Sequence, residues 1–241
     1  MALFASFAVL TAGMHVGRAP APVASVAAAI SSPSTASSLI ATAEEFINKK
    51  SGFYSPYDTD AIADDFVFRG PVIGPLNKAD YLSTMDTFKV YKAFPDISPN
   101  AFGFALDPLD ERRVWFFVRN TGTNTGPFGL GYGLEAPPSG NAVVGVPEAF
   151  SLTFDADERV RLLTVGYVAD RFEGNTGGVG AAFGLLRVAG IPLPGGLAYR
   201  AAVALSNRLP GATAKSCSKR EEVPAWWLER SEERGPDGYN L

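Results

Sequence analysis

The order of two apolar periodicities along the chain limits its fold more than any other feature. Before Pro95, apolar residues recur at helical spacing in residues 37–53 ("SSLIATAEEFINKKSGF") and again in residues 77–94. Residues 112–124, 141–157 and 158–172 are instead rich in β-branched and aromatic side chains and are bounded by Gly, Pro, Asn and Asp. Helices followed by antiparallel strands predict an α+β fold, with the N-terminal helices packed on one face of a strongly bent antiparallel sheet.

Shorter signals divide the chain further. A short helical piece around Asp58–Asp64 is expected to lead into a strand over residues 66–70, and "DADE" at 155–158 predicts a hairpin turn. Residues 174–194 and 195–211 are apolar but interrupted by Gly and Pro, so we expect extra C-terminal helices that cover the domain or lie against a partner. Neither stretch reaches the ~20 apolar residues of a membrane span. The expected parts are residues 1–37, 38–173 and 174–241.

The first part has the character of a targeting segment. Residues 1–43 contain Arg18 and no acidic residue, and a short apolar run is followed by a stretch rich in Ala, Ser and Pro. The apolar run resembles the hydrophobic core of a signal peptide, and the segment rich in Ala, Ser and Pro resembles a transit peptide. Together they look like the bipartite presequences of algae with secondary plastids, so we expect a plastid (chloroplast) location. The alternative is a disordered arm on a protein that stays elsewhere.

Several chemistries are excluded by composition. His15, the single histidine, lies in the presumed presequence, which removes Ser-His-Asp and Cys-His catalysis and makes a metal site unexpected. Residues 44–173 carry 12 basic and 19 acidic residues, so nucleic acid is an unfavourable partner. The glycine-rich stretches 126–133 and 174–180 lack the spacing that cradles phosphates and are expected to be loops, so no cofactor is expected. Cys217, the single cysteine, is expected to be inert.

The chain resembles the NTF2-like superfamily and, within it, the SnoaL-like group. The likeness is carried by "DAIADDFVFRGP", "GPLNKADYLSTMDTFKVYKAFPDI", "RVWFFVRNTGTNTGPF" and "EAFSLTFDADERVRLLTVGYV", and it covers roughly residues 38–173. It implies a cone-shaped fold around a pocket, and homodimers are common among such proteins. Activity is not implied, because this fold hosts cyclases, isomerases, dehydratases, binding modules and proteins without chemistry.

The resemblance places the catalytic positions of such enzymes on unreactive residues in this chain. The positions that carry proton-transfer groups in the family correspond here to Gly70, Phe46, Phe150 and Val165. Glu148 shares a strand face with Phe150 and Leu152 by the two-residue period, so it is a candidate acid or base, with Tyr167 or Tyr81 as a partner. Pairing with Arg119 or Arg69 and plain solvation are the alternative roles for Glu148.

The remaining expectations concern a ligand. The chain has 17 Phe against 3 Trp and 8 Tyr, which favours a pocket lined by rings without hydrogen-bonding groups. The expected ligand-binding residues are Phe66, Phe68, Arg69, Phe88, Phe116, Arg119, Phe150 and Leu152. The leading hypothesis is a domain that binds a small apolar molecule such as a pigment, isoprenoid or lipid derivative. The alternatives are an isomerase or cyclase that uses a pocket carboxylate, and a structural subunit that docks on a thylakoid complex through Trp226 and Trp227.

Overall fold

The computed structural model describes residues 33–131, 133–193 and 214–232. Its centre is a six-stranded sheet with the strand order β2-β1-β10-β9-β4-β3. The strands are β1 (Ile62–Arg69), β2 (Leu76–Asn77), β3 (Phe102–Asp107), β4 (Asp110–Val118), β9 (Glu148–Phe154) and β10 (Val160–Val168). β1 runs parallel to β10 and every other neighbouring pair is antiparallel. The prediction of an α+β fold with a mostly antiparallel sheet is therefore confirmed.

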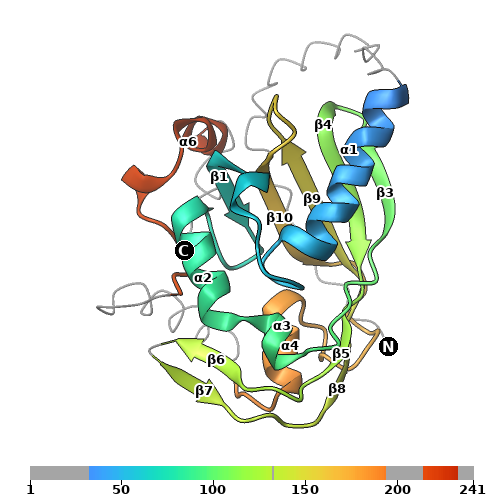
Figure 1. The fold of residues 1–241 in the computed structure, drawn as a ribbon, viewed down its shortest axis with the longest axis vertical. Helices are drawn as coiled ribbons and strands as arrows, with labels where there is room; N and C mark the ends of the chain where they lie inside the picture. The colour runs from blue at the N-terminus through green and yellow to red at the C-terminus, as the bar shows by residue number, and fades with distance from the viewer. Residues whose placement is uncertain (1–32, 132, 194–213, 233–241) are drawn as a thin grey trace, which may run out of the picture.

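Two N-terminal helices cover one face of this sheet, as Figure 1 shows. α1 (Pro33–Glu45) continues into the π-helical turn η1 (Phe46–Lys50), and together they bury Leu39, Ala43, Phe46 and Ile47. These positions lie on one side of a helix, which is why the segment packs on the sheet. α2 (Lys78–Phe88) packs against β1, and the side chain of Asn77 caps its first turn by accepting from the N–H of Asp80.

The structure corrects several expected boundaries. Residues 77–94 do not form one helix, because Lys89 takes a left-handed conformation (φ 40°) that ends α2 and starts the short α3 (Val90–Ala93). The helical piece around Asp58–Asp64 shrinks to a 3-10 turn, η2 (Thr59–Ala61). β1 begins at Ile62 because Ile62 pairs with Val160 of β10. β3, which we did not expect, pairs with β4.

Smaller strands close one end of the domain. β5 (Thr121–Thr123) pairs with β8 (Ala142–Val144), and β6 (Phe128–Gly131) pairs with β7 (Leu134–Ala136). The hairpin β6–β7 occupies part of the glycine-rich stretch that we expected to be a loop. The backbone of Gly129 packs so closely on Thr87 of α2 that a Cβ there would lie 2.1 Å from the Thr87 carbonyl oxygen. Glycine is thus required where the hairpin meets α2.

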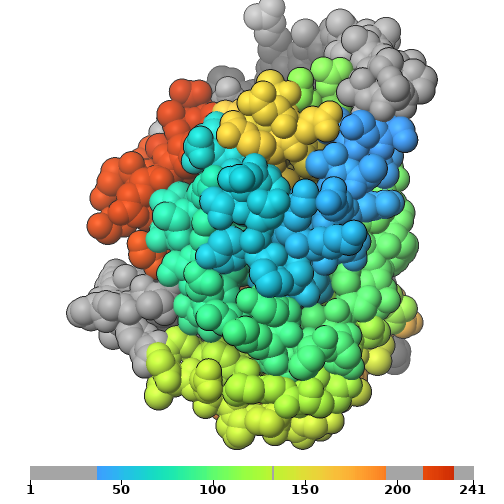
Figure 2. Space-filling view, in the orientation of Figure 1, coloured from blue at the N-terminus to red at the C-terminus, as the bar shows by residue number. Residues whose placement is uncertain are grey.

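The C-terminal part wraps back onto this body. α4 (Ala181–Val188) packs with α3, Phe128 and Val143 in a second apolar cluster. Residues 214–218, named the strap below, run beside residues 74–77, with Gly74 N–H donating to Ser216 O and Ser218 N–H donating to Pro75 O. The 3-10 turn η3 (Arg220–Glu222) and α6 (Ala225–Glu232) follow and lie along the side of α2 and β1 (Figures 1 and 2). The expected helix over residues 195–211 lies outside the described residues.

No helix within the described ranges is long and apolar enough to cross a membrane.

Candidate functional site

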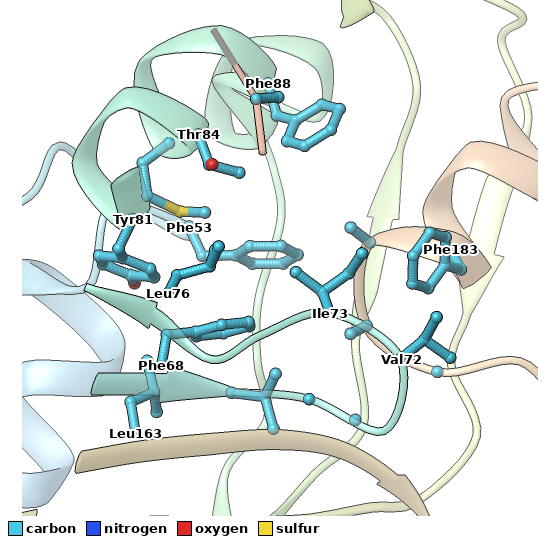
Figure 3. A pocket seen from close by; sticks show the side chains of 18 of the residues that line it. Phe53, Phe68, Val72, Ile73, Leu76, Tyr81, Thr84, Phe88, Leu163 and Phe183 are labelled. Carbon is cyan, nitrogen blue, oxygen red and sulfur yellow. The ribbon is translucent and has the colours of Figure 1, made fainter. Parts of the chain in front are cut away.

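An apolar cavity of about 450 Å³ lies between the helical layer and the sheet. Its walls come from η1, β1, α2, β10 and α4, together with the loop that follows β1 and the strap. Figure 3 shows Phe53 and Phe68 on one side, Phe183 of α4 on the other, and Ile73 between them. The volume falls in the range of cavities that hold small organic molecules.

Four hydroxyl groups in the wall are turned toward protein acceptors. Tyr54 donates to Asn120 Oδ1 (2.7 Å), Thr84 donates to Asp80 O (2.7 Å), and Ser51 donates to Ile47 O (3.3 Å). The hydroxyl of Tyr81 donates to Ser51 O. Because these hydroxyl protons are already donated within the protein, the deep part of the wall presents mainly hydrocarbon to a ligand. Such a wall is expected around an apolar ligand.

Glu148 lies directly behind this wall. Its side chain is 1% exposed, its Oε2 accepts from the N–H of Ala181 (2.7 Å), and Asn120 Nδ2 approaches Oε1 at 3.5 Å. A Cβ on Gly180 would lie 2.8 Å from Oε2, so glycine backbone separates the carboxyl from the cavity at this point. Glu148 is not among the lining residues that the structure describes.

Burial dominates the electrostatics of this corner. Desolvation raises the pKa of Glu148 to about 8, although the hydrogen bond from Ala181 acts in the opposite direction. Burial, and after it the nearby carboxyl of Glu148, raises the pKa of Tyr54 well above its ordinary value. Among the described residues no cation pairs with Glu148: Arg119 pairs with Glu173 (3.2 Å) and Arg69 donates to Gly74 O (2.6 Å). Neither the solvated nor the arginine-paired role of Glu148 matches this geometry.

The two tyrosines that we expected as partners of Glu148 lie elsewhere. Tyr81 lines the cavity, but its hydroxyl donates to the backbone oxygen of Ser51. Burial raises the pKa of Tyr81. Tyr167 is 42% exposed and stands opposite Ala149, on the other face of the sheet from Phe150. The cause is a bulge at Gly166 (φ 80°), which breaks the alternation of β10 between Thr164 and Tyr167.

The expected ligand-binding residues divide between wall and core. Phe68, Phe88 and Phe150 line the cavity. Phe66, Phe116 and Leu152 are fully buried in the apolar core beneath it, where Phe116 stacks on Phe104 (ring centroids 4.6 Å apart). Arg69 and Arg119 do not line it, because each is engaged by the partner named above.

The positions that the resemblance associates with proton transfer carry no reactive group in the wall. Gly70, Phe150 and Val165 line the cavity, and Phe46 is buried in the core close by.

Sequence reasoning missed several wall residues. Phe53 and Tyr54 follow η1 as an aromatic pair (centroids 4.9 Å apart), a signal that the sequence did contain. Ala182 and Phe183 of α4 and Lys215 of the strap reach the wall through tertiary packing, which no local pattern reports.

The strap is fixed at the cavity edge by a polar cluster. Lys215 Nζ lies 2.7 Å from Asp80 Oδ1 and 3.8 Å from Glu222 Oε2, and Ser218 donates to Asp80 Oδ2 (2.6 Å). Asp80 stands in the first turn of α2, so this cluster joins the strap to the helix that forms one wall.

The Trp226 side chain is engaged within the chain. Its Nε1 donates to Asp65 O (3.0 Å), and the guanidinium of Arg161 lies 4.5 Å from its ring centroid. These two contacts hold α6 against β1.

Comparison with known proteins gives structural likenesses alone. No family model matches the chain, and no curated protein matches it. A protein designated a SnoaL-like polyketide cyclase from Jannaschia sp. CCS1 is 17% identical, with a TM-score of 0.46 over 67% of this chain and 97% of its own. An NTF2-like protein from Anabaena variabilis ATCC 29413 is 15% identical, with a TM-score of 0.40 over 58% of this chain and 94% of its own. A protein designated a polyketide cyclase from Acidithiobacillus ferrooxidans is 20% identical, with a TM-score of 0.39 over 66% and 99%.

Proposed function

We propose that this protein binds a small apolar molecule, such as a pigment, isoprenoid or lipid derivative, in the cavity between α2, α4 and the sheet. The observation that carries the proposal is a 450 Å³ cavity whose deep wall is hydrocarbon and whose hydroxyls donate to protein acceptors. Burial of apolar ligand surface is worth roughly 25 cal/mol per Å², which is sufficient for useful affinity without a charged contact in the deep part of the cavity.

The test is a fluorescence titration with N-phenyl-1-naphthylamine, a neutral dye that brightens in apolar surroundings. We expect saturable binding of one dye per chain. Val72→Trp should weaken binding at least tenfold, because Val72 points into the cavity from the loop that follows β1 (Figure 3). Leu109→Trp is the matched control, since Leu109 is 86% exposed and lies outside the cavity. Equal loss in both variants, or no saturable binding to the unmodified protein, contradicts the proposal.

A second candidate function is isomerisation or cyclisation assisted by Glu148. The observation in its favour is a buried carboxyl with a pKa raised to about 8. The backbone at Gly180 separates this carboxyl from the cavity, so the reaction requires that segment to move aside. Near pH 8 such a group is partly ionised, and its carboxylate form can accept a proton from carbon and return it at another position. The test follows conversion of cyclohex-3-enone, a β,γ-unsaturated ketone, to its conjugated isomer by ultraviolet absorbance. Acceleration that disappears in Glu148→Gln supports the candidate, whereas no acceleration, or equal rates, removes it.

We also propose a plastid location, supported by the acid-free stretch of residues 1–43. These residues fall largely outside the described ranges, so the support comes from composition. Residues 1–37 fused to a fluorescent protein should direct it to the plastid of an alga with secondary plastids. Fluorescence confined to the cytosol or secreted would contradict this location.

A further inference from the structure

The part of the strap that borders the cavity carries a charged residue. Among the described lining residues, Lys215 alone is charged at neutral pH, and its side chain is 32% exposed. The hydrogen bond to Asp80 raises the pKa of Lys215, so the ammonium stays protonated. The hydroxyls of Tyr54 and Thr84 are already used as donors, so Lys215 is the charged donor that the described wall can offer to a polar atom of a ligand.

The ammonium has capacity for one more acceptor. It carries three N–H donors, and among the described residues Asp80 at 2.7 Å and Glu222 at 3.8 Å are its ion-pair partners, which leaves one N–H for a further acceptor. Arg69, another cation near the strap, donates to Gly74 O and does not line the cavity. A ligand atom that accepts the third N–H bond must therefore lie close to the carboxylate of Asp80, whose side chain is 11% exposed.

This arrangement discriminates by charge. A neutral oxygen gains a charge-assisted hydrogen bond from the ammonium without repulsion. A carboxylate in the same place would meet the poorly solvated charge of Asp80, and like charges in contact are unfavourable at a binding site. The negative charge of Asp80 offsets the positive charge of Lys215, so the net electrostatic attraction between this pair and an anionic ligand is small.

We propose that the ligand is a neutral molecule with one terminal oxygen, an alcohol, aldehyde, ketone or ester, whose hydrocarbon fills the cavity and whose oxygen accepts a hydrogen bond from Lys215. This inference rests on the proposed function and narrows its ligand class. Free fatty acids and other apolar carboxylates are disfavoured.

The test uses three compounds with the same carbon skeleton: the hydrocarbon 2-ethylnaphthalene, the alcohol 2-(2-naphthyl)ethanol, and the acid 2-naphthylacetic acid, which is a carboxylate at pH 7. The affinity of each compound is measured by its displacement of bound N-phenyl-1-naphthylamine from the full chain at pH 7. We expect the alcohol to bind more tightly than the acid by at least tenfold. Lys215→Met should weaken alcohol binding about tenfold, the loss expected for one hydrogen bond to a charged group, and leave hydrocarbon binding within twofold.

Two further variants sharpen the result. Asp80→Asn should strengthen acid binding severalfold, because it removes the repelling charge and preserves the side-chain shape. Lys219→Met is the matched control: Lys219 is 67% exposed, lies 3.5 Å from Glu222 Oε1 and is not a lining residue, so all three affinities should stay unchanged.

The outcomes separate this inference from the proposed function. Tighter binding of the acid than of the alcohol, or a Lys215→Met effect that is absent or equal for alcohol and hydrocarbon, overturns the inference and leaves the apolar cavity intact as a site. Failure of all three compounds to displace the dye contradicts the proposed function, and the inference falls with it.

Discussion

The N–H of Ala181 donates to Oε2 of Glu148 over 2.7 Å and joins the first residue of α4 to the first residue of β9. Ala181 has a positive φ of 48°, so the chain enters α4 in a conformation that side chains seldom adopt, and the carboxyl provides its first hydrogen-bond acceptor. Because Ala181, Ala182 and Phe183 line the cavity, this contact fixes one wall of the candidate site.

Glu148 should make stability depend on pH between about 4.5 and 8. Burial raises its pKa from 4.5 to about 8, so in this window the folded chain keeps a proton that the unfolded chain loses. The free energy of unfolding therefore falls as pH rises, by ~5 kcal/mol in total, and the loss is complete above pH 8. Urea unfolding followed by circular dichroism at pH 5, 7 and 9 measures this slope.

Glu148→Gln should remove most of that slope, because its amide oxygen can still accept from Ala181 and carries no charge. Glu111→Gln, at an exposed position of β4, is the matched control and should retain the slope. An unchanged slope in Glu148→Gln would mean that Glu148 does not hold the raised pKa.

Gly180→Ala should destabilise the domain by about 2 kcal/mol. Its Cβ would lie 2.8 Å from Glu148 Oε2 and 3.1 Å from Val168 Cγ2, so either the carboxyl or α4 must move. Gly70→Ala is the matched control, since it also lines the cavity and its Cβ would meet nothing closer than 3.5 Å. Thermal unfolding of the two variants compares them, and equal melting temperatures would argue against tight packing at Gly180.

Substitution of Trp226 and substitution of Trp227 should have different effects on stability, although the two residues are adjacent in the chain. Trp226→Phe loses the hydrogen bond to Asp65 O and part of the contact with Arg161, at a cost of about 1 kcal/mol. Trp227 Nε1 is buried without a hydrogen-bond partner among the described residues, so Trp227→Phe should be neutral or stabilising. Denaturant midpoints measure both, and a larger loss at Trp227 would contradict the packing of α6.

The sequence predicted the sheet better than the cavity. β9, β10 and their turn were readable because Leu152, Phe154 and Val160 follow a strand pattern bounded by turn residues. The sequence also predicted a strand over residues 66–70 with Phe66 and Phe68 as ligand-binding residues. It could not separate them by depth: Phe66 is fully buried in the core, whereas Phe68 borders the cavity.

Tyr167 and Lys215 show what local sequence patterns cannot predict. Tyr167 leaves the expected face because one bulge at Gly166 shifts the register of β10, and a bulge has no reliable signature in a single sequence. Lys215 reaches the cavity edge because Asp80, 135 positions earlier in the chain, holds it there, a contact that depends on the complete fold.

The most direct measurement is a crystal structure of the protein grown with N-phenyl-1-naphthylamine. The account predicts the dye between Phe68, Ile73 and Phe183, with its rings inside the cavity of about 450 Å³ (Figure 3). Dye stacked on the exposed pair Phe102 and Phe117, with the cavity left without dye, would contradict it.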